Sequence, residues 1–375
     1  MRFVIDVGTI NERGTSVACY DYARFGEEIL GNDVIIAYRA KAVQQAGVFE
    51  RFTGRFHSFA YTDNDDLVAK SAHEKADVLY RLMGKDEKPF PTKGLWLANH
   101  AIFRVDTAHG DVFAYVSEWL SDLTSGGVRP FVPHIIDLPE PGSDLRKRLG
   151  IPQEACVIGR HGGYDQFNLP FLKGVVEKIL EERPDVWFVF LNTKPFVTHQ
   201  RVIYLPATSD LQEKSDYINA CDAMLHARKL GESFGLAMGE FLYFNKPVIC
   251  WYGGIDRNHL RMQRDPSLVY YSAHDLLRIL RKFQARPKGA DQAAWLEFRR
   301  QYSPETVMRK FNDVFLTPST SASYEDKRSR GIMPSSSRVR IARRLHRRAF
   351  KIFNEASIAA ARLSVQFPMR YSEDG

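Results

Sequence analysis

The 375-residue sequence has little of the features that mark disulfide-rich, metal-binding or membrane-spanning proteins. Its four cysteines, Cys19, Cys156, Cys221 and Cys250, are far apart and form no CxxC pair. We therefore expect buried free thiols in a reducing compartment. No apolar run approaches the roughly 18 residues of a spanning helix, and the opening MRFVIDVGTI predicts a strand in place of a secretory signal. These absences predict a cytoplasmic protein.

Charge is distributed unevenly along the chain, although the formal net charge is +7. Residues 317–375 contain twelve Lys or Arg and five Asp or Glu, which accounts for the whole excess. The rest of the chain carries 40 basic and 40 acidic side chains and is neutral. Any inference from a basic composition therefore concerns the carboxyl-terminal segment alone.

Strand-like and helix-like patterns alternate along both halves of the chain. Strands are expected at 3–8, 33–39, 56–62, 156–160, 186–192, 201–206 and 222–228, and helices at 17–30, 171–182, 210–219 and 276–283. Residues 66–83 fit either one helix or a short helix and a strand, and 94–103 and 111–120 fit buried strands or strands that lead into helices. This alternation predicts parallel βαβ units and an α/β fold.

The pattern and composition divide the chain into five parts. We expect a Rossmann-like domain over 1–131, a proline-containing linker over 132–155, a second Rossmann-like domain over 156–300, a helix over 301–316, and a Ser/Pro linker with a basic amphipathic tail over 317–375. The sequence thus predicts two α/β domains followed by a basic tail.

The segment 226–250, HARKLGESFGLAMGEFLYFNKPVIC, contains Glu232 and Glu240 on either side of a glycine-containing turn. Apolar strands are expected directly before and after it, with a helix that carries Glu240 between them. The first turn of such a helix offers backbone N–H groups and a positive dipole to a phosphate. Gly235 has no Cβ, so the backbone can come close to a ligand there.

The spacing of the two glutamates argues against glycoside hydrolysis. Eight residues of helix rise about 12 Å, whereas the paired carboxylates of a hydrolase lie roughly 5–9.5 Å apart. Glu232 and Glu240 are better placed to accept hydrogen bonds from the two ends of a long polar ligand with a central diphosphate. A nucleotide-sugar has this form.

The Glu-x7-Glu spacing in GESFGLAMGE and the following KPVI resemble retaining GT-B glycosyltransferases of the family 4 type. The resemblance implies two Rossmann-like domains with a cleft between them, the acceptor on the first domain, the donor on the second, and a terminal helix that crosses back. It implies that Glu232 contacts the transferred hexose and is catalytic, that Glu240 binds the ribose, and that the backbone of Phe234, Gly235 and Leu236 faces the diphosphate.

Other donor-site and acceptor-site residues follow from the same resemblance. Arg160 matches a diphosphate-binding arginine, but the lysine that related enzymes carry soon after it is missing from HGGYDQFN. Lys194 or Arg228 is expected to supply the second positive charge. Gly14, in the loop TINERGTS, resembles an acceptor-side glycine, and an ordinary turn also explains it. His100 is expected near the reacting sugar as a catalytic residue, with a core histidine as the alternative.

The expected function is transfer of a sugar, with retention, from a nucleotide-diphosphate sugar to a glycan, lipid-linked or small hydroxyl acceptor, without metal or other cofactor. A catalytically inactive nucleotide-binding or scaffold protein is the alternative. The segment 338–353 predicts a basic amphipathic helix that binds an anionic membrane surface. A tail with no binding partner is one alternative. Nucleic-acid binding is the weakest alternative, because the tail has no groove-binding motif or interleaved aromatics.

Overall fold

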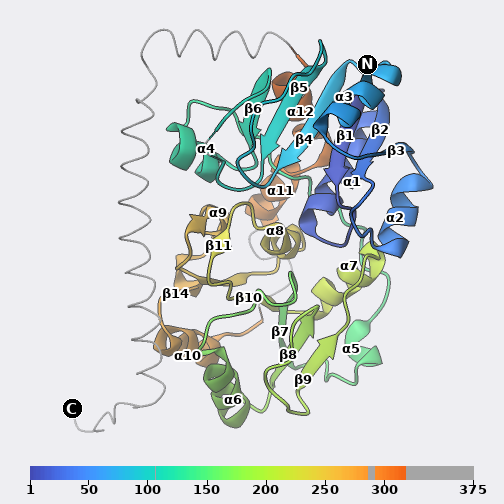
Figure 1. Cartoon of the computed structure of the whole chain (residues 1–375). Coiled ribbons are helices and arrows are strands. Elements are labelled where there is room, and N and C mark those ends of the chain that lie inside the picture. Colours follow the sequence, from blue (N-terminus) through green and yellow to red (C-terminus); the bar gives the residue numbers. More distant parts are fainter. Residues whose placement is uncertain (106, 286–291, 318–375) are drawn as a thin grey trace. The chain divides into compact units, whose positions relative to one another are not determined.

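The computed structural model describes residues 1–105, 107–285 and 292–317, which form two compact α/β units (Figure 1). Of these residues, unit 1 contains Met1–Asp137 and 299–317, and unit 2 contains Leu138–Phe298 apart from the gap at 286–291. The chain therefore forms one unit, passes through the second, and returns to the first.

Unit 1 is built on a parallel sheet with the strand order β3-β2-β1-β4-β5-β6. Its strands are β1 (Arg2–Gly8), β2 (Asp33–Arg39), β3 (His57–Tyr61), β4 (Val78–Met83), β5 (Trp96–Ala101) and β6 (Val112–Tyr115). The order changes direction between β1 and β4, and ligands of open α/β sheets bind at the carboxyl ends of strands beside such a switch point.

Helices cover both faces of the sheet in unit 1. One face packs against α1 (Gly14–Glu28), α2 (Ala46–Thr53), α12 (Pro304–Phe311) and the π-helical turn Asn312–Leu316. The other face packs against α3 (Asn64–His73), and α4 (Glu118–Ser125) follows β6. The indole N–H of Trp96 donates to the carbonyl of Phe315 over 2.9 Å. The returning segment 299–317 is thus part of the unit 1 core.

Unit 2 repeats this topology, with the strand order β14-β12-β10-β7-β8-β9. Its strands are β7 (Cys156–Arg160), β8 (Val186–Leu191), β9 (Val202–Leu205), β10 (Ala223–His226), β12 (Val248–Trp251) and β14 (Val269–Tyr270). A separate parallel pair joins β11 (Gly231–Glu232) to β13 (Asp256–Arg257). The switch point of the larger sheet lies between β7 and β10.

The helices of unit 2 also lie on two faces. The apolar sides of α6 (Leu172–Glu182) and α10 (Ala273–Lys282) pack on one face of the sheet. The other face carries α7 (Leu211–Ala220) and α8 (Leu236–Tyr243), which pack together through Tyr217 and Phe241, with 6.1 Å between the ring centroids. Shorter elements are α5 (Leu145–Arg148), α9 (Asn258–Met262) and the 3-10 turn Pro266–Leu268, and α11 (Gln292–Gln301) leads from unit 2 back into unit 1. α8 connects β10 to β12, so its first turn lies at the carboxyl end of β10.

The structure confirms the expected α/β alternation. It resolves 66–83 into α3 and β4, and 111–120 into β6 and the start of α4, where the Ser117 hydroxyl accepts from the Leu120 N–H. The four cysteines are buried free thiols. Among the described residues, every helix is too short or too polar to cross a membrane. The tail predicted over 317–375 lies, from 318 on, outside the described residues.

Candidate functional site

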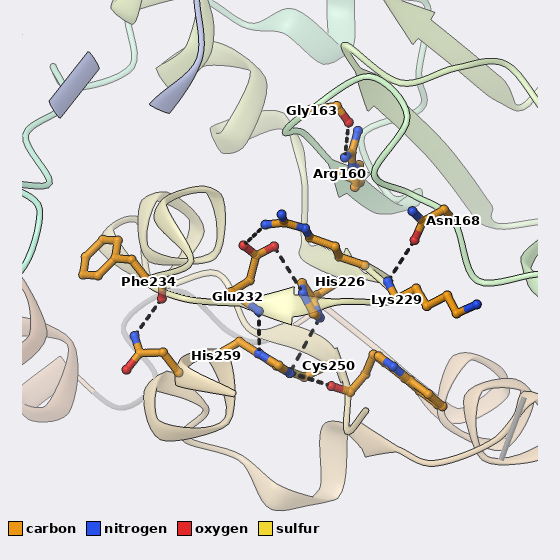
Figure 2. Close-up of polar contacts among 12 residues, drawn as sticks. Arg160, Gly163, Asn168, His226, Lys229, Glu232, Phe234, Cys250 and His259 are labelled. Carbon is orange, nitrogen blue, oxygen red and sulfur yellow. Dashed lines mark hydrogen bonds and ion pairs between the residues drawn. The ribbon is translucent and has the colours of Figure 1, made fainter. Parts of the chain in front are cut away.

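The expected donor residues gather at the switch point of unit 2. The carboxyl ends of β7 and β10 are neighbours in the sheet, since Ala223 pairs with Ile158 and Met224 with Gly159. The loop after β7 begins at Arg160, and the loop after β10 carries Arg228 and leads to Glu232. Figure 2 shows Arg160, at the end of β7, and Glu232, on β11. The topology therefore brings together residues about 70 positions apart.

Glu232 does not lie on the helix that carries Glu240. It ends the short strand β11, and α8 begins only at Leu236, after Gly235. Helical rise, which gave about 12 Å, therefore does not apply to this pair, because the first four of the eight steps between them are not helical. The argument against glycoside hydrolysis, which used this estimate of the Glu232–Glu240 separation, therefore no longer holds.

The Glu232 carboxylate is held by two side chains from the end of β10. The Arg228 guanidinium donates to Glu232 Oε2 over 2.6 Å, and His226 Nε2 lies 3.5 Å from Glu232 Oε1 (Figure 2). Burial alone would raise the pKa of Glu232, but the His226 contact and the Arg228 charge outweigh burial and lower the pKa to about 2. Glu232 is consequently ionised near neutral pH and accepts hydrogen bonds.

The first turn of α8 is arranged to receive an anion. Gly235 precedes the helix with a φ of 99°, a conformation that glycine adopts at little cost. The N-cap residue Gly235 has no side chain with which to cap the helix, and the first turn has no acidic residue. The N–H groups of a first helical turn have no acceptor within the helix. This helix end thus offers hydrogen-bond donors and a positive dipole beside Glu232.

Glu240 lies inside α8 and is 4% exposed. Its two oxygens lie 2.9 Å from Lys214 Nζ and 2.9 Å from His161 Nε2. Burial would raise the pKa of Glu240, but the charge of Lys214 and the contact with His161 lower the pKa to about 2. Glu240 is therefore a second ionised carboxylate, and its partners come from α7 and from the end of β7.

Arg160 joins the loops that follow β7 and β8. Its guanidinium donates to the Gly163 carbonyl over 2.7 Å, the Thr193 hydroxyl over 2.7 Å and the Asn192 carbonyl over 3.1 Å. Burial lowers the pKa of Arg160 to about 10, so it stays charged. Arg160, which was expected to bind the diphosphate, thus also connects these two loops. Lys194, next in that loop, is exposed, and its backbone N–H donates to the Tyr164 carbonyl.

His100 and Gly14 belong to unit 1. The His100 ring is fully buried, and its Nδ1 lies 2.7 Å from the Tyr80 hydroxyl. Burial and the nearby His134 lower the pKa of His100 to about 3, so the ring is neutral. Gly14 is the exposed first residue of α1. The catalytic role of His100 and the acceptor-side role of Gly14 stay predictions.

The structure adds functional candidates that sequence reasoning missed or passed over. They are the partners of the two glutamates and of the loop between them: His161, Lys214, His226, Asn258 and His259. His161 directly follows the arginine at the end of β7, which was a usable signal. Lys214 and His259 had none, because their contacts depend on how distant elements pack.

His226, Cys250 and His259 form a buried cluster whose potential metal ligands lie within 4.8 Å of one another. Both ring nitrogens of His259 already pair with backbone groups, the Glu232 N–H and the Trp251 carbonyl. Metal coordination by this ring would break one of those bonds. Burial also raises the pKa of Cys250 far above its usual range, which favours the neutral thiol.

No protein-family profile matches the sequence, and no curated protein resembles it in sequence. Similar solved structures include HepE from Anabaena in complex with UDP and glucose, at 12% identity and a TM-score of 0.59, covering 84% of this chain and 98% of that chain. A glycosyltransferase from Rickettsia africae is 12% identical, with a TM-score of 0.58 and coverages of 84% and 97%. Sucrose-phosphate synthase from Thermosynechococcus elongatus is 13% identical, with a TM-score of 0.51 and coverages of 88% and 99%.

These similarities extend over both sheets of the chain and over nearly all of each solved structure. The chain therefore has the GT-B fold, with two Rossmann-like α/β units. At 12–13% identity the similarity establishes the fold alone.

Proposed function

We propose that this protein is a retaining glycosyltransferase, which moves a sugar from a nucleotide-diphosphate sugar to a hydroxyl acceptor. The observation that carries the proposal is the first turn of α8, with a glycine as its N-cap residue, between two glutamates whose pKa values are both lowered to about 2. A diphosphate suits the helix end, and ionised carboxylates suit the hydroxyls of the rings on either side of it. HepE, with the same fold, was solved with UDP and glucose, the two parts of such a donor.

In the proposed complex each part of the donor has its own partners. The diphosphate binds the backbone N–H groups of 234–236, with Arg228, Arg160 and Lys194 as cations. Glu232 accepts hydrogen bonds from the transferred hexose, and Glu240 accepts from the ribose. Each carboxylate oxygen has two lone pairs, so the contacts with Arg228 and Lys214 leave capacity for a sugar hydroxyl.

The chemistry assigned to these residues is electrostatic. Bond cleavage leaves negative charge on the departing diphosphate, and the helix end and the arginines stabilise it without a metal ion or other cofactor. Glu232 is ionised, so it is a hydrogen-bond acceptor and not a general acid. We place the incoming hydroxyl on the same face as the leaving group, which gives retention, and His100 on the acceptor side.

The second candidate is a nucleotide-binding or scaffold protein without catalysis. One observation favours it: Glu240 is 4% exposed, and both of its oxygens are already paired. Ribose binding then requires Glu240 to share or exchange a partner. A scaffold would bind a nucleoside diphosphate without turning over any sugar donor.

The test compares the wild type with Glu232→Gln and Glu240→Gln. Each protein is titrated with UDP, ADP and GDP by calorimetry and assayed with the matching glucose donors for transfer and hydrolysis. We expect Glu232→Gln to lower kcat by about 100-fold with little change in nucleotide affinity. Glu240→Gln should weaken nucleotide binding by roughly 10-fold. Nucleotide binding with no turnover of any donor would favour the scaffold, and wild-type behaviour of both variants would refute the site.

The other partners follow from sequence alone and are part of the proposal. The acceptor is a carbohydrate or a lipid-linked hydroxyl compound, and nucleic acid is not a partner. The basic segment 338–353 brings a cytoplasmic enzyme to an anionic membrane surface as a peripheral protein. A lipid-linked acceptor would be found at the same surface.

A further inference from the structure

A short segment, 256–259, holds the loop that carries Glu232. β13 pairs with β11 so that Gly231 faces Asp256 and Glu232 faces Arg257. The Asp256 N–H also donates to the Leu230 carbonyl over 3.1 Å. The backbone from Leu230 to Glu232 is therefore a strand of a small ladder and not an independent loop.

His259 binds the backbone of Glu232 directly. The Glu232 N–H donates to His259 Nδ1 over 3.2 Å, and His259 Nε2 donates to the Trp251 carbonyl over 3.0 Å (Figure 2). A carbonyl oxygen only accepts, so the hydrogen of the neutral ring must be on Nε2. Burial and the nearby His226 lower the pKa of His259 to about 3, so the ring is neutral at neutral pH and its two hydrogen bonds select this tautomer. The ring thus links the end of β12 to Glu232.

Asn258 holds the other end of the same loop. Its buried side-chain amide donates to the Phe234 carbonyl over 2.7 Å (Figure 2). Together, Asn258 and His259 fix the backbone on both sides of Ser233, just before α8 begins. The orientation of the first helical turn depends on that backbone.

The close contact at Gly231 shows how tightly the loop is packed. Gly231 has a φ of 71°, and a Cβ there would lie 1.9 Å from the Asp256 carbonyl oxygen. On the side toward β7, the Asn168 amide oxygen accepts the Lys229 N–H over 2.8 Å (Figure 2). The loop is therefore fixed from two directions, and the backbone contacts are separate from those that hold the Glu232 side chain.

We propose that Asn258 and His259 are positioning residues, which hold Glu232 and the first turn of α8 in the geometry that reads the sugar of the donor. That the ligand is a sugar donor depends on the proposed function. The fixed geometry itself is a separate claim about the backbone. Neither residue touches the substrate, so both act through Glu232 and Phe234.

The test uses His259→Leu, which removes both ring hydrogen bonds at similar volume, and His259→Gln, whose amide has one acceptor and one donor. His274→Leu, at an exposed histidine of α10, is the matched control. We expect His259→Leu to lower kcat/KM for the sugar donor roughly 10- to 100-fold. His259→Gln should restore most of it, and His274→Leu should match the wild type. Affinity for UDP alone should fall clearly less than kcat/KM does, because Glu240 and its partners are intact and only the N–H groups that bind the diphosphate are displaced.

Crystal structures of the same proteins decide the geometric claim independently of activity. We expect the Glu232 carboxylate to leave Arg228, or residues 231–235 to shift, in His259→Leu and not in His259→Gln. An unmoved loop in His259→Leu would overturn the inference even if activity falls. Equal losses of UDP affinity and turnover in both His259 variants would also overturn it, as general damage. A wild type that turns over no donor refutes the proposed function instead, and the crystal structures still decide whether His259 fixes the loop.

Discussion

The two sheets share one topology, yet their switch points hold opposite kinds of polar cluster. In each, the first strand stands third in the order, and the chain adds two strands on one side and three on the other. The topology thus offers two equivalent places for a ligand at the carboxyl ends of the strands. The residues at those places decide what each can do.

At the unit 1 switch point, the charged side chains pair with one another. Asp6 on β1 faces Arg81 on β4, and Arg81 Nε donates to Asp6 Oδ2 over 2.9 Å. The Tyr61 hydroxyl donates to the other Asp6 oxygen over 2.7 Å, and Glu87 lies 3.2 Å from the Arg81 guanidinium. Asp6 and Arg81 are both buried. This cluster connects strands and a loop and resembles a structural ion pair.

At the unit 2 switch point, the charged groups lie beside a helix end whose N-cap glycine has no side chain. Arg160 and Arg228 bring two positive charges to the loops after β7 and β10, and Glu232 brings one negative charge. This excess of positive charge can accept an anion, whereas in the unit 1 cluster Arg81 is already paired with two carboxylates, those of Asp6 and Glu87. The comparison teaches that the fold provides two equivalent candidate places and that the local charges make one of them the better candidate for an anion.

The largest effect is expected from breaking the unit 1 cluster. Arg81→Ala leaves Asp6 buried without its cation, which should lower the free energy of unfolding by about 3–5 kcal/mol. Urea unfolding measures the loss. Lys173→Ala, at the exposed Lys173–Glu177 pair, is the control and should change stability by less than about 0.5 kcal/mol. If the two variants were equally stable, the Asp6–Arg81 pair would have no structural role.

An intermediate effect on stability is expected from a change of pH. The buried histidines and the ionised glutamates should lose their contributions to stability in different pH ranges. The pKa of His100 is about 3 in the folded protein and 6.5 for an ordinary histidine, so the unfolded state binds an extra proton between those values. Stability contributed by neutral His100 is therefore lost as pH falls below 6.5. Between pH 7 and 5 we expect a loss of roughly 2 kcal/mol from this residue.

Urea unfolding of the wild type and of His100→Asn at pH 7 and pH 5 checks the histidine prediction. The variant should lose less stability than the wild type on acidification. Glu232 and Glu240 should contribute no loss in this window, because their pKa values of about 2 lie below the ordinary value of 4.5. Their stabilisation is lost only between about pH 4.5 and 2. Parallel losses in wild type and variant would show that His100 is not a neutral core group.

The smallest effect is expected from the basic tail, which lies outside the described residues. Deletion of 331–375 should leave activity on a soluble acceptor unchanged and reduce binding to vesicles with anionic lipid by roughly tenfold at low salt. Co-sedimentation with anionic and neutral vesicles measures the difference. Unchanged binding to anionic vesicles would leave the tail without a membrane role.

Much of the fold and part of the site could be predicted from the sequence. Apolar runs such as 186–192 and 222–228 correspond to β8 and β10, since strands buried on both faces are apolar along their length. The glycine-containing turn and the helix after it were also predicted. The position of Glu232 was not, because a two-residue strand such as β11 has no periodic signal of its own.

The residues that charge and orient the site were the hardest to predict. Lys214 reaches Glu240 from another helix, and His259 reaches Glu232 across 27 positions of sequence. Such pairs depend on the register of strands and the packing angle of helices, which no local pattern encodes. A lone Lys or His in a helical segment is consistent with a solvated surface as well as with a site.

By itself, the sequence determined the α/β alternation, the helix that starts after Gly235, and the two glutamates that stand on either side of that start. Only the tertiary structure decided that both carboxylates are ionised, which partners hold them, and which of the two switch points has positive charge to spare. The physical reason is the distance along the sequence over which each effect acts. Periodicity and turn chemistry act within a few residues, whereas a pKa and an ion pair depend on burial and charges that folding brings together from distant segments.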